Sequence, residues 1–366
     1  MLQKALVLFL VLASIAGCVS CTSSSSHYLY ATLPVTNQIL AYREDPNSGV
    51  LTEISGSPFA AGEGARSLVI HPSGKFFYVA NPGQGGAAEN DISLFDIASN
   101  GVIAEITPRF SVAPNASTPQ LLVMDPAGAY LYVMNTGSDN ISVFAIDSGS
   151  GALSEVANSP FSIGLLPLNM QVTPAGDFLY VTLASEPNGL IAAYSLNAGQ
   201  LSPLGTTSTG GINPYGLVID AAGANLYVAN YGPSNSLSVF SIGSSGALTT
   251  IPGSPLNEGY SDPVAMIFDP SGSYLYVADQ SSANVAVFSI DSNGLPAVLS
   301  TSSGTNAYGT EASPSFLVED PSGKYLFVGS QGTGAGIQSF SVNSGVLFAV
   351  HINSTGNTPS SIAILP

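Results

Sequence analysis

The stretch DPSGSYLYVAD, residues 269–279, decides the fold of this chain because it recurs along almost its whole length. A Pro-Ser-Gly turn leads into a run of aromatic and β-branched residues, which predicts a tight turn followed by a strand. Five further copies are HPSGKFFYVAN (71–81), DPAGAYLYVMN (125–135), TPAGDFLYVTL (173–183), DAAGANLYVAN (220–230) and DPSGKYLFVGS (320–330). Their turn glycines lie 47 to 54 residues apart, which is the period of a tandem array.

Three other strand patterns recur in the same order around each copy. An alternating run with one aromatic residue follows each copy, as in ISVFAI (141–146) and VAVFSI (285–290). A glycine-led run comes next, as in SGALSEV (150–156), and an apolar run such as DPVAMIFDP (262–270) precedes the Pro-Gly turn. Four strands in about 50 residues, repeated seven times, predict an all-β fold, a β-propeller of seven four-stranded antiparallel blades.

The two ends of the repeat array complement each other. The last segment, TPSSIAILP (358–366), is an innermost strand with nothing after it, and HYLYATL (27–33) is a second strand with nothing before it. We therefore expect one shared blade, in which residues 360–364 pair with residues 28–32 and close the ring. Such pairing leaves no free strand edge at the seam.

The first residues predict export rather than structure. Lys4 precedes an apolar run that ends in Ile15-Ala16-Gly17-Cys18, which is typical of a signal peptide. These four residues resemble the lipobox of bacterial lipoproteins, which implies cleavage after residue 17 and a lipid on Cys18. We expect a signal peptide over 1–17, a lipidated polar tether over 18–26, and a single propeller over 27–366. The expected location is the bacterial cell envelope, at the outer membrane, and the alternative is a periplasmic or secreted protein.

The charge balance disfavours one class of partner. Six Lys and Arg against 23 Asp and Glu give a net charge of −17, which repels a phosphate backbone. We expect no nucleic-acid partner and no membrane contact except through the lipid. The expected partner is a small molecule, or an envelope protein or glycan, at one face of the ring.

That face is the one where the innermost strands begin, because its loops vary while the opposite turns are uniform. The residues predicted to face this channel mouth, or to lie just before an innermost strand beside it, are Arg66, Gln120, Asn169, Tyr215, Asp262 and Glu311. Arg66 is one of three arginines in the chain, and a guanidinium there could hold a carboxylate or a lactone carbonyl. The alternative is an ion pair with Glu63 or with another carboxylate at the mouth. Asp262 and Glu311 could act as bases or cation ligands, or be solvated loop acids.

No metal site or cofactor is predicted. The three histidines are scattered in the sequence, so they do not form a ligand set, and no Gly-x-Ser-x-Gly motif is present. A divalent cation in the channel remains an open alternative.

Together the repeats DPSGxYLYVAN, ISVFSI and SGALTxIxGSPF resemble the lactonase-type seven-bladed β-propeller family. That family includes 6-phosphogluconolactonase-like proteins and fungal carboxymuconate-lactonizing enzymes, and YVTN-repeat surface proteins share the YVAN strand. The resemblance implies chemistry on lactones. Enzymes of the family typically carry a His directly after the Pro that opens an innermost strand. Here those positions are Gln120, Leu168, Tyr215, Val264, Ser315 and Ser360.

Two hypotheses follow. In the first, the chain is an envelope-anchored scaffold that binds a ligand or partner at the channel mouth, and the missing His favours this interpretation. In the second, the chain is a lactone hydrolase or lactonizing enzyme that acts on a small lactone and uses Arg66 with a carboxylate at the mouth.

Overall fold

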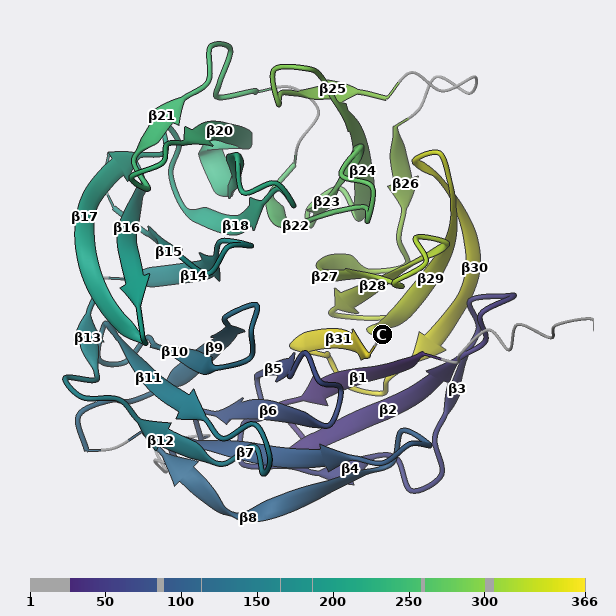
Figure 1. Cartoon of the computed structure of the whole chain (residues 1–366). Coiled ribbons are helices and arrows are strands. Elements are labelled where there is room, and N and C mark those ends of the chain that lie inside the picture. The colour runs from purple at the N-terminus through teal and green to yellow at the C-terminus, as the bar shows by residue number, and fades with distance from the viewer. Residues whose placement is uncertain are drawn as a thin grey trace, which may run out of the picture.

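The computed structural model describes residues 27–83, 89–112, 114–164, 166–185, 187–257, 261–299 and 306–365. Over these residues the chain forms seven antiparallel sheets around a central channel (Figure 1). The expected signal peptide, Cys18 and the tether to residue 26 lie outside the described residues. Within the described part of the chain, no helix is both long and apolar enough to cross a membrane.

Each blade contributes one innermost strand to the channel wall. In blade order, starting with the shared blade, these strands are β31 (Ser361–Leu365), β5 (Ser67–Ile70), β9 (Pro119–Met124), β14 (Pro167–Val172), β18 (Pro214–Ile219), β22 (Pro263–Phe268) and β27 (Ser313–Glu319). The second strands contain the YLYVAN motif and are buried along almost their whole length. They are β1 (Tyr28–Leu33), β6 (Phe76–Asn81), β10 (Tyr130–Asn135), β15 (Phe178–Leu183), β19 (Asn225–Asn230), β23 (Tyr274–Asp279) and β28 (Tyr325–Gln331).

Each third strand carries one aromatic residue. These strands are β2 (Gln38–Glu44), β7 (Asp91–Ile97), β11 (Asn140–Ile146), β16 (Leu190–Asn197), β20 (Ser236–Ile242), β24 (Asn284–Ile290) and β29 (Gly336–Asn343). A short 3-10 helix, η1 (Gly232–Ser234), lies in the loop before β20.

The outermost strands differ between blades. Three are long and continuous: β8 (Ile103–Ser111), β17 (Gln200–Ser208) and β30 (Val346–Ser354). The fourth, β21 (Leu248–Thr250), is short, and Leu256 beyond it forms an isolated bridge with Leu237 of β20. In three blades the edge consists of two short pieces that both pair with the third strand: β3 (Leu51–Glu53) with β4 (Phe59–Ala60), β12 (Leu153–Glu155) with β13 (Phe161–Ser162), and β25 (Pro296–Val298) with β26 (Ala307–Gly309). The prediction of four strands per blade is thus confirmed, with a fifth short strand added in these three sheets.

The ring closes as the two chain ends predict. β31 lies on the channel side of β1 and pairs with it antiparallel, with Tyr30 opposite Ala363 and Thr32 opposite Ser361 (Figure 1). The paired segment is 361–365, one residue further along the chain than expected. Ile362 and Ile364 pack with Phe327 of the neighbouring blade, so the seam is part of the hydrophobic core.

Neighbouring blades are joined by a contact that repeats around the ring. In four of the described blades the buried Tyr in the middle of the second strand donates its hydroxyl to the carbonyl of the turn glycine before the outermost strand of the next blade; these residues are Tyr30, Tyr78, Tyr180 and Tyr227. Tyr78, for example, donates to the carbonyl of Gly151 at 2.7 Å, and Tyr227 donates to that of Gly294 at 2.7 Å. The recurring tyrosines and glycines of the sequence therefore hold the blades in register around the channel.

Candidate functional site

The channel mouth holds a pocket of about 650 Å³. It lies where the innermost strands begin, on the face that the loop pattern predicts. Its polar lining includes Arg66, Gln120, Asn169, Gln280, Ser315 and Gln331. Leu121, Leu168, Leu217, Val264 and Met266 line it with apolar surface, and Leu217 and Met266 also line the cavity at the opposite end of the channel. The pocket therefore has polar residues at its rim and apolar residues further into the channel.

A β-bulge places the rim residues of five blades. The register between the first two strands of the blade skips the residue after the Pro, as at Tyr215 between Pro214 and Gly216, and at Val264 between Pro263 and Ala265. A residue in a bulge does not pair with the neighbouring strand, and its side chain does not follow the regular alternation between the two faces of the sheet. The residue after the Pro is thereby directed into the mouth.

The loops behind these strands are fixed by Asn and Asp side chains. Asn90 and Asn235, both with positive φ, accept the backbone N–H of Thr118 and Asp262 at 2.7 and 2.9 Å. Asp139 accepts the N–H of Leu166 at 3.1 Å in the same way. The mouth is therefore a preorganised frame rather than a set of free loops.

Four of the six predicted residues line the pocket: Arg66, Gln120, Asn169 and Tyr215. The amide of Asn169 donates to the carbonyl of Tyr215 at 2.8 Å, and the Tyr215 ring lies 5.4 Å from that of Tyr231. These contacts form one wall of the mouth, with a half-exposed aromatic face on it.

Asp262 and Glu311 are not among the lining residues. Asp262 has a φ of +55°, and its carboxylate accepts hydrogen bonds from the Gly232 backbone and the Ser281 hydroxyl, so it holds a loop. Glu311 is exposed, and its backbone N–H donates to Gln338 at 3.3 Å. The prediction that these two acids take part in the mouth is therefore not supported by the lining.

A second ring of lining residues, at the position after the YVAN motif where the second strands end, was not predicted from the sequence. They are Thr136, Tyr231, Gln280 and Gln331. Gln280 donates to the hydroxyl of Ser315 at 3.2 Å. The repeats could have predicted this ring, because every second strand ends at the mouth and the residue after its YVAN motif therefore lies there.

Arg66 is exposed at the rim, and among the described residues no carboxylate forms an ion pair with it. The expected alternative, a pair with Glu63, is therefore not formed. The guanidinium is available to a ligand.

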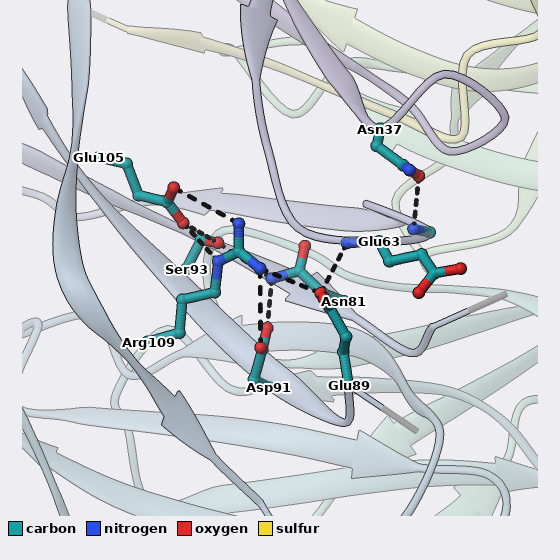
Figure 2. Close-up of polar contacts among 9 residues, drawn as sticks. Asn37, Glu63, Asn81, Glu89, Asp91, Ser93, Glu105 and Arg109 are labelled. Carbon is teal, nitrogen blue, oxygen red and sulfur yellow. Dashed lines mark hydrogen bonds and ion pairs between the residues drawn. The ribbon is translucent and has the colours of Figure 1, made fainter. Parts of the chain in front are cut away.

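Arg109 shows the opposite arrangement. Its guanidinium lies 2.6 Å from Glu105, 3.0 Å from Glu89 and 3.8 Å from Asp91. Figure 2 shows these acids around the guanidinium. Glu89 also accepts the backbone N–H of Glu63 at 2.9 Å (Figure 2). This cluster neutralises Arg109 and anchors the loop that leads into Arg66.

Comparison with known proteins agrees with the architecture. The family described as "Lactonase, 7-bladed beta-propeller" matches residues 21–165, 163–251 and 232–303. The chain belongs to this family.

Two curated relatives are named 6-phosphogluconolactonase. The one from Formosa agariphila is 27% identical over 147 residues, which cover 39% of this chain and 40% of that protein. The one from Bacillus subtilis is 27% identical over 161 residues, which cover 43% and 45%. The matched segments thus span less than half the length of either relative.

Solved structures share the whole fold. The periplasmic gluconolactonase of Pseudomonas aeruginosa has a TM-score of 0.73 and 17% identity, covering 93% of this chain and 99% of that one. A Bacteroides fragilis protein provisionally named a 6-phosphogluconolactonase has a TM-score of 0.77 and 19% identity, covering 94% and 99%. At these identities the likeness concerns the fold.

Proposed function

We propose that this protein is a lactonase that binds a small, polyhydroxylated lactone in the channel-mouth pocket. The observation that carries the proposal is the guanidinium of Arg66, which forms no ion pair with any described residue and lies at the rim of a pocket with both polar and apolar lining. Family membership and the names of the relatives support the same substrate class.

The lining suits such a molecule. Sugar lactones carry several hydroxyl groups on a compact ring, and Gln120, Asn169 and Gln331 offer both donors and acceptors for them. The Tyr215 ring offers an apolar face for the carbon skeleton. A volume of about 650 Å³ is ample for one monosaccharide-sized ligand. Arg66 is the only Lys or Arg among the described residues of the lining, so an uncharged or singly anionic lactone fits better than a phosphorylated one.

In the reaction, water adds to the lactone carbonyl, the ring C–O bond breaks, and a hydroxy acid forms. Negative charge develops on the carbonyl oxygen, and a guanidinium aimed at that oxygen stabilises the transition state. The product is a carboxylate, which Arg66 would also bind. Neither a carboxyl group nor an imidazole belongs to the described residues that line the pocket. The rate enhancement expected from this site is therefore mainly electrostatic.

The test is hydrolysis of a panel of aldonolactones, followed by proton release, with the wild type, Arg66→Gln and Arg43→Gln. Arg43 is exposed on β2, far from the pocket lining, so its substitution controls for the loss of one positive charge. We expect Arg66→Gln to lower kcat/KM about 100-fold and Arg43→Gln to leave it unchanged. Equal activity of all three proteins would refute the role of Arg66.

A second candidate is ligand binding without turnover, as in the scaffold hypothesis. It is favoured by the absence of an acid or base among the described lining residues. Calorimetry with a lactone and with its hydroxy acid separates the two candidates. Saturable binding without any hydrolysis would support the scaffold, with a glycan or an envelope protein as its larger ligand.

We also propose that the chain is exported and held in the cell envelope by a lipid on Cys18. The basis is the order of Lys4, the apolar run and Cys18 in the sequence. With Cys18→Ser, the protein should move from the membrane fraction to the soluble fraction. Unchanged fractionation and an unmodified Cys18 by mass spectrometry would contradict the anchor.

A further inference from the structure

Glu44 breaks the pattern of the repeat at the ring seam. It ends the third strand of its blade, and the six equivalent residues in the other blades are Ile97, Ile146, Leu196, Ile242, Ile290 and Val342. The backbone confirms the equivalence, since Glu44 N–H donates to the carbonyl of His27 at 2.9 Å, just as Ile97 N–H donates to that of Lys75 at 2.8 Å. A carboxylate thus replaces an aliphatic side chain.

Glu44 is fully buried, at 0% exposure. One carboxylate oxygen, Oε2, hydrogen-bonds His27 Nδ1 at 3.0 Å, whereas Oε1 has no partner among the described residues. No Lys or Arg of the described chain pairs with it. A buried carboxylate whose charge is not balanced by a positive partner and hydrogen bonds destabilises the folded state by several kcal/mol. The burial of Glu44 therefore indicates that a positive partner binds there.

A second buried carboxylate lies beside this pair. Asp320, 1% exposed, is in the turn between β27 and β28 of the last blade. It is held in place because one of its oxygens accepts the backbone N–H groups of Lys324 and Tyr325 at 2.7 and 2.6 Å. One ligand atom each of His27, Glu44 and Asp320 lies within 4.8 Å of the others, so one ion could reach all three.

We propose that His27, Glu44 and Asp320 form a site for a divalent first-row transition metal such as Zn²⁺. One imidazole nitrogen with two carboxylates suits zinc, whereas calcium and magnesium prefer oxygen ligands alone. The side chain of His27 is 12% exposed, which leaves room for water to complete the coordination. The expectation of no metal site rested on the scattered histidines, and folding brings one of them to two acids that are 17 and 293 residues away.

The position of the site gives the metal a role. His27 directly precedes β1, Glu44 ends β2, and Asp320 belongs to the last blade. A bound ion would therefore link the start of the first blade to the last blade, next to the pairing of β31 with β1 (Figure 1). Metal binding would reinforce the closure of the ring.

The experiment is Zn²⁺ titration of untagged, EDTA-stripped protein by calorimetry, with the melting temperature measured in parallel. We expect one Zn²⁺ per chain and a melting temperature higher by about 5 °C at a 100-fold excess over Kd. Glu44→Gln and His27→Asn should each weaken binding about 100-fold. Glu44→Ile, which restores the residue type of the other blades, should bind no Zn²⁺ and should melt at a higher temperature than the metal-free wild type.

Two matched controls exclude surface binding. His351 is an exposed histidine on an outermost strand, and Asp269 caps the equivalent turn one blade earlier. His351→Asn and Asp269→Asn should bind Zn²⁺ as the wild type does. Failure of the stripped wild type to bind millimolar Zn²⁺ would overturn the proposal. Binding that survives both Glu44→Gln and His27→Asn would also overturn it, whether or not Glu44→Ile folds.

Discussion

At the scale of single residues, the second strands end in a recurring buried amide. Asn81, Asn135 and Asn230 each donate from Nδ2 to a serine of the third strand, Ser93, Ser142 and Ser238, at 2.8 to 3.0 Å. Asp279 occupies this position in β23, where it pairs with Asn284, and Ala286 of the next strand stands where the other three blades have the serine. Burial, opposed by a hydrogen bond from the Ser261 backbone, raises the pKa of Asp279 to about 7.

This pKa predicts a specific pH dependence of stability. The folded protein keeps the Asp279 proton up to about pH 7, whereas the unfolded chain loses it near its ordinary value of 3.8. Stability should therefore fall as the pH rises between these values, by up to about 1.4 kcal/mol per pH unit. Asp279→Asn should remove this part of the fall and stabilise the protein at pH 8.

The measurement is urea unfolding of the wild type and Asp279→Asn at pH 5 and pH 8. The pKa values of Glu44 and Glu319 are also raised by burial, to about 7 and about 8, so both proteins share their contribution. Only the difference between the two proteins reports on Asp279. An identical pH dependence in both would show that Asp279 is ionised in the folded state.

Residue types alone predicted part of the mouth. Gln120 and Tyr215 could be placed there because each follows the Pro that opens an innermost strand. Asp262 could not be placed correctly, because its positive φ turns the side chain toward Gly232 and Ser281. Glu44 gave no sequence signal of chemistry, since its partners lie far away along the chain.

At the scale of strands and turns, glycines before the outermost strands make the contacts between blades possible. A Cβ on Gly101, where φ is +80°, would lie 2.3 Å from Cδ1 of Tyr28 in the preceding blade. Gly272 has a similar φ of +70°, but a Cβ there would meet nothing within 4 Å. The two glycines therefore share the conformational requirement and differ in packing.

We predict that Gly101→Ala destabilises the protein by about 2 kcal/mol more than Gly272→Ala. Both substitutions cost about 1 kcal/mol for a side chain in the left-handed region, and only Gly101→Ala adds a steric conflict with the preceding blade. Chemical denaturation of both variants gives the difference. Equal destabilisation would mean that the blades can separate slightly at no cost.

At the scale of the whole molecule, the repeat pattern was sufficient to predict the seven blades and the closure of the ring. Turn residues and apolar alternation are local properties, so they can be read along the chain. The split outer strands depend on how blades pack side by side, which the pattern of one blade does not contain.

Ring closure makes a prediction for truncation. Removing residues 360–366 deletes β31 and exposes the inner edge of β1, together with the apolar surface that Ile362 and Ile364 cover. We expect the melting temperature to fall by about 10 °C or more and the truncated chain to associate through the open edge. Size-exclusion chromatography and thermal unfolding measure both effects. A monomer with an unchanged melting temperature would contradict closure by β31.

The central claim is that ligand chemistry takes place in the mouth pocket, and closing that pocket tests it most directly. Val264 projects from the bulge of β22 into the pocket, and Val298 is 58% exposed on the outer strand β25. The measurement is kcat/KM for the best lactone with Val264→Trp and Val298→Trp, both verified as folded. We predict a loss of about 100-fold for Val264→Trp and none for Val298→Trp. Full activity of Val264→Trp would place the chemistry elsewhere on the molecule.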